Sequence, residues 1–352
     1  MDVHNAFLHG DLDEEVFMQF PLGFCTNDKN KVCRLEKSLY GLKQAPRCWF
    51  DKLTTALKDY GFEQNVSNYS LFMYQKHDTQ LQLLVYVDDH VISVNSCGVI
   101  NQFKEYLSSC FKMKNLGVLR YFLGIEVARS SEGMYLCERK YALDIIVETC
   151  LLGVKPISFP LEQNYKLFSV DDEPLSDLSS YRHLVGRLIY LGVTRPKLSY
   201  FVNVLAQFMH KLQPAHWNVA LRVVRYLKNN HSQGIFLRSN TKLILSAWCY
   251  FDWDNFPTTH HSLTGWFIQL GGSTLSWKTK KHDRVSRFSV EAEYRDMADT
   301  VSELLWLQEL LRAFGIDCFF ITLHSDSLFS NPTCQFQFFM RKLNILLVIF
   351  TS

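Results

Sequence analysis

The feature that most constrains the fold is an apolar stretch, residues 81–94, that is interrupted by two adjacent carboxylates. It reads Leu-Gln-Leu-Leu-Val-Tyr-Val-Asp-Asp-His-Val-Ile-Ser-Val, so Asp88 and Asp89 stand between two runs of β-type residues. This pattern predicts a β-hairpin with the two acids at its turn. Neighbouring carboxylates on a rigid turn repel each other, and a divalent cation between them removes that repulsion. An ordinary Asp-rich β-turn is the alternative that this segment alone leaves open.

The composition indicates a globular protein of more than one domain. The 352 residues are 47% hydrophobic and 20% charged, a length and composition that predict two domains or three subdomains with a sizeable core. The net charge is only +2, so we expect any nucleic-acid surface to be a local patch.

The cysteines and the apolar runs bear on the compartment. Ten cysteines are scattered without a Cys-x-x-Cys pair or zinc-type spacing, which indicates a reducing environment and no disulfide framework. No signal peptide is recognisable, and the apolar stretch at residues 345–350 is too short to span a bilayer. These features predict a cytoplasmic or nuclear protein that is not secreted and has no membrane partner.

Two further motifs precede the hairpin. The chain begins Met-Asp-Val-His-Asn-Ala-Phe-Leu-His-Gly-Asp, and residues 38–47 read Ser-Leu-Tyr-Gly-Leu-Lys-Gln-Ala-Pro-Arg. Together with the Tyr-Val-Asp-Asp hairpin, they resemble the reverse transcriptase of copia-type LTR retrotransposons, of the plant kind. The resemblance continues through residues 111–117, 121–127, 181–191 and 194–196 and extends to about residue 332.

The resemblance implies a multidomain fold of the α+β and α/β classes. It predicts a polymerase palm sheet with packed helices at residues 1–153 and a helical thumb and connection at 154–240. A ribonuclease H-like α/β domain is expected at 241–332, and residues 333–352 depart from the family pattern. We interpret that tail as a frameshifted relic, and we expect the fingers subdomain, which precedes Asp2 in relatives, to be missing.

The resemblance also assigns the chemistry. It implies that Asp2, Asp88 and Asp89 are the catalytic carboxylates and hold two Mg²⁺ ions, roughly 3.5–4 Å apart, for nucleotide addition. Hard cations need oxygen ligands, and the short Asp side chain holds them rigidly. The implied partners are an RNA template, a DNA primer, their RNA–DNA hybrid and deoxynucleotides. A non-catalytic remnant that binds RNA–DNA hybrids is the alternative.

Several residues around these acids are implied to contact substrate. Phe7 would lie beneath the incoming sugar and disfavour a 2′-hydroxyl, although a core aromatic explains it equally well. The loop and helix start that would meet the templating pair and phosphate contain Gly41, Lys43, Gln44 and Arg47; the primer grip would be Phe122, Leu123 and Gly124. Without the family, these segments read as an ordinary turn with solvated cations and as a strand with a kinking glycine.

Helical spacing of apolar residues predicts several helices. The stripe Trp49, Phe50, Leu53 and Leu57 predicts a core-facing helix that ends at Gly61. Further helices are expected around residues 103–110 and between 181 and 227. The second group carries cations that the resemblance assigns to phosphate contacts, with a solvated helix face as the alternative: Arg182, Arg187, Arg195, Lys197, Arg222, Arg225 and Lys228.

The ribonuclease H-like region lacks part of its implied ligand set. The family motif places Glu291 and Asp326 as metal ligands, but Tyr250 occupies the position of the first aspartate. A phenol is neutral at physiological pH and is a poor Mg²⁺ ligand. Asp252 lies two residues, or roughly 6.6 Å, further along the strand, too far to replace that carboxylate. We therefore expect loss of hybrid cleavage, and we expect Ser289 to cap the helix that carries Glu291.

Overall fold

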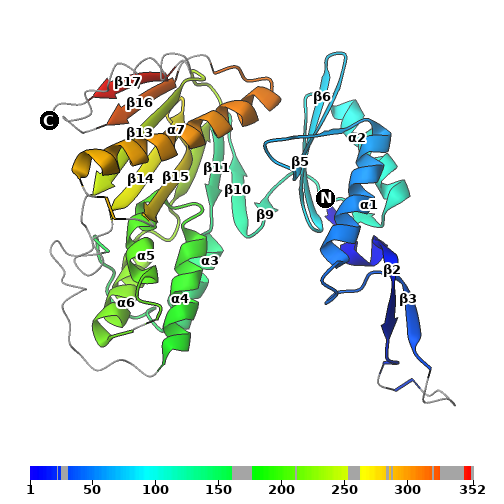
Figure 1. The fold of residues 1–352 in the computed structure, drawn as a ribbon, viewed down its shortest axis with the longest axis horizontal. Helices are drawn as coiled ribbons and strands as arrows, with labels where there is room; N and C mark the ends of the chain where they lie inside the picture. Colours follow the sequence, from blue (N-terminus) through cyan, green and yellow to red (C-terminus); the bar gives the residue numbers. More distant parts are fainter. Residues whose placement is uncertain are drawn as a thin grey trace. The chain divides into compact units, whose positions relative to one another are not determined.

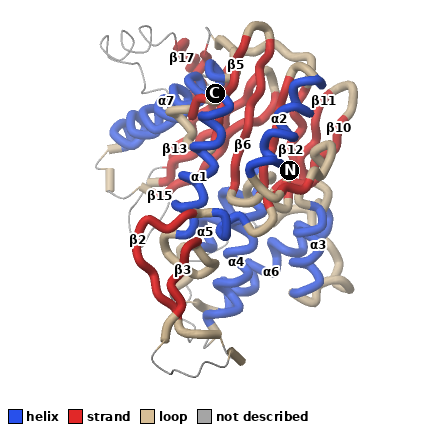
Figure 2. The backbone as a smooth tube through the Cα atoms, turned by 90° about the vertical axis from the view of Figure 1, so that its right-hand side faces the viewer, coloured by secondary structure: helices blue, strands red, loops and turns tan. Residues whose placement is uncertain are grey.

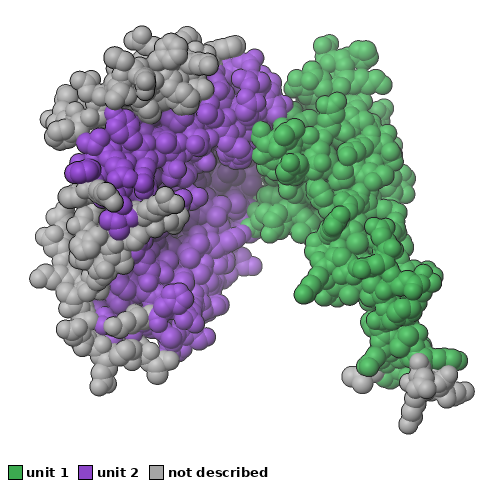
Figure 3. Space-filling view, viewed as in Figure 1, with its two compact units in different colours: residues 1–123 green, residues 124–352 purple. Residues whose placement is uncertain are grey.

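The computed structural model divides the chain into two compact units, Met1–Leu123 and Gly124–Ser352 (Figure 3). The structure describes all residues except 22, 25–30, 161–176, 211, 253–261, 283–284, 287, 319–320, 326–344 and 350–352. The fold is mixed α/β with several sheets (Figures 1 and 2).

Unit 1 contains a six-stranded sheet in the order β4-β5-β6-β7-β1-β8. Its strands are β1 (Asp2–Val3), β4 (Glu63–Gln64), β5 (Leu71–Lys76), β6 (Thr79–Tyr86), β7 (Asp89–Val94) and β8 (Met113–Lys114). The 3₁₀ helix η1 (Ala6–His9) follows β1, and β2 (Asp11–Met18) pairs with β3 (Cys33–Lys37) as a separate two-stranded ribbon. Strand β9 (Tyr121–Phe122) lies at the end of the unit.

Two helices, α1 (Ala45–Tyr60) and α2 (Cys97–Cys110), pack against the six-stranded sheet (Figure 2). Alternate residues of β6 point into the core that the two helices also line. One face of β6 is therefore buried, and the opposite face, which includes the exposed Tyr86, is more accessible to solvent. The buried cluster includes Trp49, Leu53 and Leu57 from α1, Phe103 and Leu107 from α2, and Leu81, Leu83 and Val85 from β6.

Both predicted helices of unit 1 are confirmed. Helix α1 ends where Gly61 adopts φ +107°, a left-handed conformation that closes a helix without the strain of a Cβ. The apolar stripe of α1 faces the core as its spacing predicts.

Unit 2 begins with three adjacent antiparallel strands and a helical bundle. The strands are β10 (Ile125–Arg129), β11 (Gly133–Cys137) and β12 (Gly234–Arg238). The bundle consists of α3 (Arg139–Glu148), α4 (Leu178–Leu191), the 3₁₀ helix η2 (Pro196–Leu198), α5 (Ser199–Ala206) and α6 (Pro214–Asn229). These helices share one apolar core, which confirms the helices predicted between residues 181 and 227.

A five-stranded sheet in the order β15-β14-β13-β16-β17 completes unit 2. Strands β13 (Leu245–Asp252), β14 (Leu263–Leu270) and β15 (Ser273–Lys281) are antiparallel, whereas β16 (Ile321–Ser325) and β17 (Ile345–Ile349) continue from β13 in parallel. Helix α7 (Ser289–Ala313) lies across this sheet and buries Met297, Leu304 and Leu307 (Figure 1).

The start of α7 differs from the sequence prediction. The expectation that Ser289 caps α7 is wrong, because Ser289 is the first helical residue and Phe288 holds the cap position in an extended conformation. No helix in the described part of the chain is long and apolar enough to cross a membrane.

Candidate active site

The acidic turn joins β6 to β7. Tyr86 pairs with Asp89 across the hairpin, so Val87 and Asp88 form the two-residue loop and Asp89 is the first residue of β7. The hairpin predicted from the sequence is therefore present, with its loop one residue earlier than the Asp-Asp pair. Asp89 and the exposed Tyr86 share the face opposite the buried Val85.

Strand β1 brings Asp2 to this turn. Asp2 stands directly opposite Asp89 of β7 on one side and Lys114 of β8 on the other. Directly opposed residues in an antiparallel pair have Cβ atoms about 4.5–5.5 Å apart on one face of the sheet. The N–H of Val3 also donates a 2.9 Å hydrogen bond to the carbonyl oxygen of Asp88. These pairings join the start of the chain to a turn more than eighty residues later.

Asp88 lies in the electric field of the other two carboxylates. The pKa of Asp88 is raised, first by burial and then by the negative charges of Asp2 and Asp89. One oxygen of Asp88, Oδ1, is buried and has no hydrogen-bond partner among the described residues. An unsatisfied buried carboxylate oxygen is costly, and a cation or a proton relieves that cost.

These oxygen donors fit Mg²⁺ as a ligand class. Among the residues that the structure describes, no three His, Cys, Asp or Glu side chains form a ready-made metal cage. Mg²⁺ does not require one, because it is usually bound through one or two carboxylates together with waters and substrate phosphates. Asp2, Asp88 and Asp89 are the residues that would hold it.

Phe7 packs against the core of unit 1 and also contacts Tyr40, a residue that had no predicted role. The ring of Tyr40 lies 4.9 Å from that of Phe7, centre to centre, and Ser38 donates a hydrogen bond to the Phe7 carbonyl oxygen. The pKa of Tyr40 is raised by burial and by the charge of Asp88, so its phenol lies within electrostatic reach of the acids. Tyr40 lies within the motif at residues 38–47, but the motif does not show which of its side chains contacts Phe7.

The residues of the loop before α1 and of its first turn differ in backbone conformation, exposure and hydrogen-bond partners. Gly41 has φ +97°, and a Cβ added there would meet no atom within 4 Å, so its backbone conformation, and not a close approach, requires glycine. Lys43 is exposed, Gln44 donates a 2.9 Å hydrogen bond to Glu14, and Arg47 lies 3.7 Å from Asp51 on the next turn of α1. The side chain of Arg47 is 87% exposed, so that ion pair leaves it accessible to phosphate.

The segment expected to hold the primer forms a tight turn. Phe122 ends β9, and Leu123 and Gly124 follow with φ +49° and +78°. Two successive positive φ values reverse the chain within two residues, and Leu123 adopts a conformation that is uncommon for a branched side chain.

Most cations of the helical bundle have partners within the protein, and for the buried Arg195 the phosphate-contact expectation is wrong. Arg195 is 1% exposed and donates to the carbonyl oxygens of Asn230 and His231 at 2.7 and 2.6 Å. Lys228 donates to three carbonyl oxygens in the segment after α3, among them that of Val154 at 2.7 Å. Arg182, Arg187 and Arg225 also have protein partners: Met209, Glu148 and Lys155, respectively.

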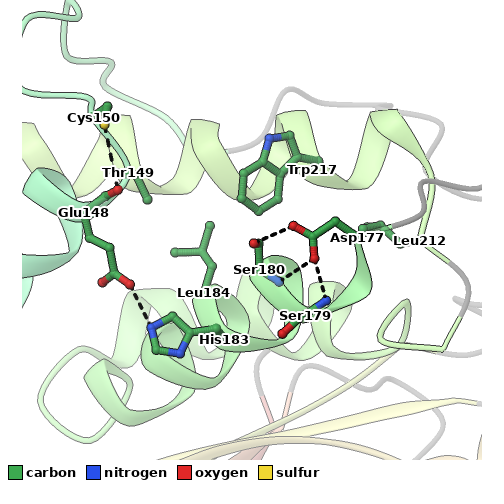
Figure 4. A pocket seen from close by; sticks show the side chains of 10 residues that line it. All are labelled: Glu148, Thr149, Cys150, Asp177, Ser179, Ser180, His183, Leu184, Leu212 and Trp217. Atoms are coloured by element: carbon green, nitrogen blue, oxygen red, sulfur yellow. Dashed lines mark hydrogen bonds and ion pairs between the residues drawn. The ribbon is translucent and has the colours of Figure 1, made fainter.

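A cavity of about 700 Å³ in this bundle contains none of the predicted site residues. Figure 4 shows His183 in contact with Glu148 and the N-terminus of α4 capped by Asp177 at its edge. The same Glu148 also pairs with Arg187. Among the described residues its lining contains the carboxylates Glu148 and Asp177 and no lysine or arginine, a set that does not suit phosphate.

The ribonuclease H-like residues are only partly described. Tyr250 is 54% exposed at the end of β13, and Asp326 lies outside the described residues. On α7, Glu291 is paired with Arg295 at 2.6 Å, whereas Glu293 is buried with 4% exposure. The two glutamates are two residues apart and therefore lie on different sides of α7; Glu293, four residues before the buried Met297, is on the side that packs on the sheet.

Comparison with known proteins identifies relatives for nearly the whole chain. Residues 1–163 match the sequence family described as reverse transcriptase (RNA-dependent DNA polymerase). The Retrovirus-related Pol polyprotein from transposon RE2 of Arabidopsis thaliana is 43% identical over 317 residues, which are 90% of this chain and 22% of that polyprotein. The putative transposon Ty5-1 protein of Saccharomyces cerevisiae is 32% identical over 309 residues, 86% of this chain and 100% of the relative.

The extent of these matches differs among the relatives. A Pol polyprotein from transposon TNT 1-94 of Nicotiana tabacum is 32% identical over 90% of this chain and 24% of its own length. The chain thus spans about a quarter or less of the plant polyproteins that it matches. A solved structure of Marinitoga piezophila Argonaute with guide RNA is 8% identical, covers 93% of this chain and 76% of its own, and has a TM-score of 0.26, too low to support a fold assignment.

Proposed function

The chain belongs to the copia-type retrotransposon Pol family, in its reverse transcriptase region, and from this premise we propose that it carries the metal-dependent site of an RNA-directed DNA polymerase. In this proposal residues 1–153, which include the six-stranded sheet, are the palm, and residues 154–240, which include α4, α5 and α6, are the thumb and connection. The observation that carries it is the placement of Asp2 opposite Asp89, beside Asp88.

The roles of the residues follow from their chemistry. When bound, two Mg²⁺ ions would stabilise the attacking and leaving oxygens of the nucleotidyl transfer. Asp2, Asp88 and Asp89 would hold them, and their mutual repulsion in the free protein favours cation binding. Phe7, backed by Tyr40, would limit the space beside the sugar, and the exposed Lys43 and Arg47 would contact phosphate.

Primer extension tests this proposal. The full chain is incubated with a poly(rA) template, an oligo(dT) primer, dTTP and Mg²⁺, and Asp88→Asn is compared with Asp59→Asn, which removes an exposed acid of α1. We expect incorporation in the wild type and in Asp59→Asn, and a loss of at least about 100-fold in Asp88→Asn. Salt-sensitive binding of the primed template without any incorporation would instead support the hybrid-binding remnant.

A second candidate function concerns the five-stranded sheet. We propose that residues 241–332 form a ribonuclease H-like domain that does not cleave RNA, supported by the parallel strands β13 and β16 beneath α7. The family resemblance requires an acidic metal ligand at the position of Tyr250, and a phenol cannot replace it. On α7 the buried glutamate is Glu293, whereas the resemblance assigns the ligand role to Glu291. Incubation with an RNA–DNA hybrid and Mg²⁺ should leave the RNA strand intact; cleavage would contradict the proposal.

A further inference from the structure

Trp49 has a hydrogen-bond partner outside the core in which it is buried. Its side chain is 2% exposed, and its indole Nε1–H donates a 3.0 Å hydrogen bond to the carbonyl oxygen of Val87. The ring also meets Phe111 edge-on, with centroids 5.0 Å apart, and lies 5.8 Å from the ring of His9. Packing on these sides fixes the direction in which the indole N–H points.

The acceptor lies in an unfavourable backbone conformation. Val87 has φ +50°, which is unusual for a β-branched residue. It is the first residue of a two-residue hairpin loop, and Asp88, the second, does not have a positive φ. Hairpin loops of this form favour glycine at the first position, so a valine there requires compensation from its surroundings.

We propose that Trp49 is a positioning residue for the acidic turn: its indole N–H holds the Val87 carbonyl and thereby keeps Val87 in the left-handed conformation that presents Asp88 and Asp89 to Asp2. The carbonyl belongs to the peptide unit that joins Val87 to Asp88, so holding it fixes the start of the Asp88 backbone. The Val3 N–H holds the other end of Asp88 at 2.9 Å. This inference rests on the proposed function, because it takes the acidic turn as the metal site.

The test measures the turn and the metal separately from catalysis. Trp49→Phe keeps an aromatic ring in the core but removes the donor. We expect hydrogen–deuterium exchange of the peptide spanning residues 85–90 to become roughly tenfold faster, the change expected for one lost hydrogen bond. We expect Mn²⁺ affinity, measured by electron paramagnetic resonance titration as a probe with the same oxygen preference as Mg²⁺, to fall by a similar factor.

Rescue distinguishes positioning from packing. Glycine adopts φ +50° without strain, so Val87→Gly in the Trp49→Phe protein should restore slow exchange and Mn²⁺ affinity to within about threefold of wild type. Val87→Ala removes the same branched side chain but keeps a Cβ, and it should not rescue. If Trp49→Phe does not fold, the two Val87 variants in the wild-type protein still test the strain, because Val87→Gly should exchange more slowly than Val87→Ala.

A tryptophan far from the acidic turn in sequence serves as the control. Trp217→Phe, which alters a partly buried tryptophan of α6, should change neither measurement. Equal exchange in Trp49→Phe and wild type, or equal rescue by Val87→Gly and Val87→Ala, would overturn the inference. If the wild type binds Mn²⁺ with the predicted dependence on Trp49 but never extends a primer, the positioning inference stands and the polymerase proposal fails.

Discussion

Thr194 donates a 2.8 Å hydrogen bond to the carboxylate of Glu138, and both side chains are buried. Glu138 precedes α3, and Thr194 follows α4. The next residue, Arg195, donates to the carbonyl oxygens of Asn230 and His231 at the end of α6. This buried network therefore ties three helices of unit 2 together, and it uses a cation that the sequence suggested for nucleic acid.

Arg195→Met should destabilise the fold without changing electrostatic binding of nucleic acid. Removing the guanidinium leaves the buried Glu138 without its nearby positive charge and two carbonyls without donors, a loss of about 3–5 kcal/mol. Urea unfolding measures the stability, and the salt dependence of hybrid binding measures the phosphate contacts. Lys197 is exposed, and Lys197→Met should change the free energy of unfolding by no more than about 0.5 kcal/mol from the wild-type value. If folded Arg195→Met protein binds the hybrid with an affinity that depends less steeply on salt concentration than the wild-type affinity does, this prediction is wrong.

Stability should fall in acid because of His90. This side chain is 3% exposed, and burial, together with the N-terminal ammonium group, lowers its pKa to about 3. Below pH 6.5 the unfolded chain binds a proton that the folded chain refuses until about pH 3, so stability decreases as pH falls through that window. The slope from this residue is at most about 1.4 kcal/mol per pH unit.

Replacement of His90 identifies its share of that slope. His90→Leu places an apolar side chain in the same core and should flatten the dependence of urea unfolding on pH between about 6.5 and 4. His210→Gln removes an exposed histidine and should leave the slope unchanged. The same slope in His90→Leu and wild type would show that other groups cause it.

Two glycines should respond to alanine with opposite signs. A Cβ at Gly10 would lie 2.9 Å from atoms of Ser38, Cys48 and Trp49, so Gly10→Ala should cost about 1–3 kcal/mol. Gly98 lies in α2 with no atom within 4 Å of such a Cβ, and Gly98→Ala should stabilise by about 0.5–1 kcal/mol. Thermal unfolding of both variants checks the signs; stabilisation by Gly10→Ala would refute the close packing of η1 on α1.

Phe7 should control discrimination between deoxyribose and ribose if the proposed polymerase activity is present. Phe7→Val removes the ring that Tyr40 contacts at 4.9 Å and opens space for a 2′-hydroxyl. The ratio of kcat/KM for dTTP over UTP should then fall roughly 10- to 200-fold. Phe50→Val, which removes a half-buried ring of α1 that packs on Phe72, serves as the control and should keep the wild-type ratio.

The sequence predicted those features that depend on local pattern. The period of apolar residues identified α1 with its end at Gly61, and the Asp-Asp interruption identified the β6–β7 hairpin. The three acids were brought together only by the family resemblance, because nothing local to Asp2 indicates that β1 inserts between β7 and β8.

The remaining features depend on contacts between distant segments. Charge alone suggested that Arg195 and Lys228 face phosphate, but backbone carbonyls released at helix ends bind them. The Tyr40–Phe7 contact joins segments far apart in the sequence, and the helical spacing of Trp49 does not reveal where its indole N–H points. By contrast, Glu293 could have been assigned to the buried face of α7 from the sequence, because it precedes Met297 and Val301 at four-residue spacing.

The order of strands in unit 1 has a consequence for folding. Strands β4, β5, β6 and β7 are joined by short connections and can pair as soon as they are synthesised, whereas β1 must wait for partners that lie at the far end of the unit. We therefore expect β1 to dock late. In a newly made chain Asp2 would then approach Asp88 and Asp89 only after the neighbouring strands have formed. The contacts of those strands would already be present to offset the repulsion among the three carboxylates.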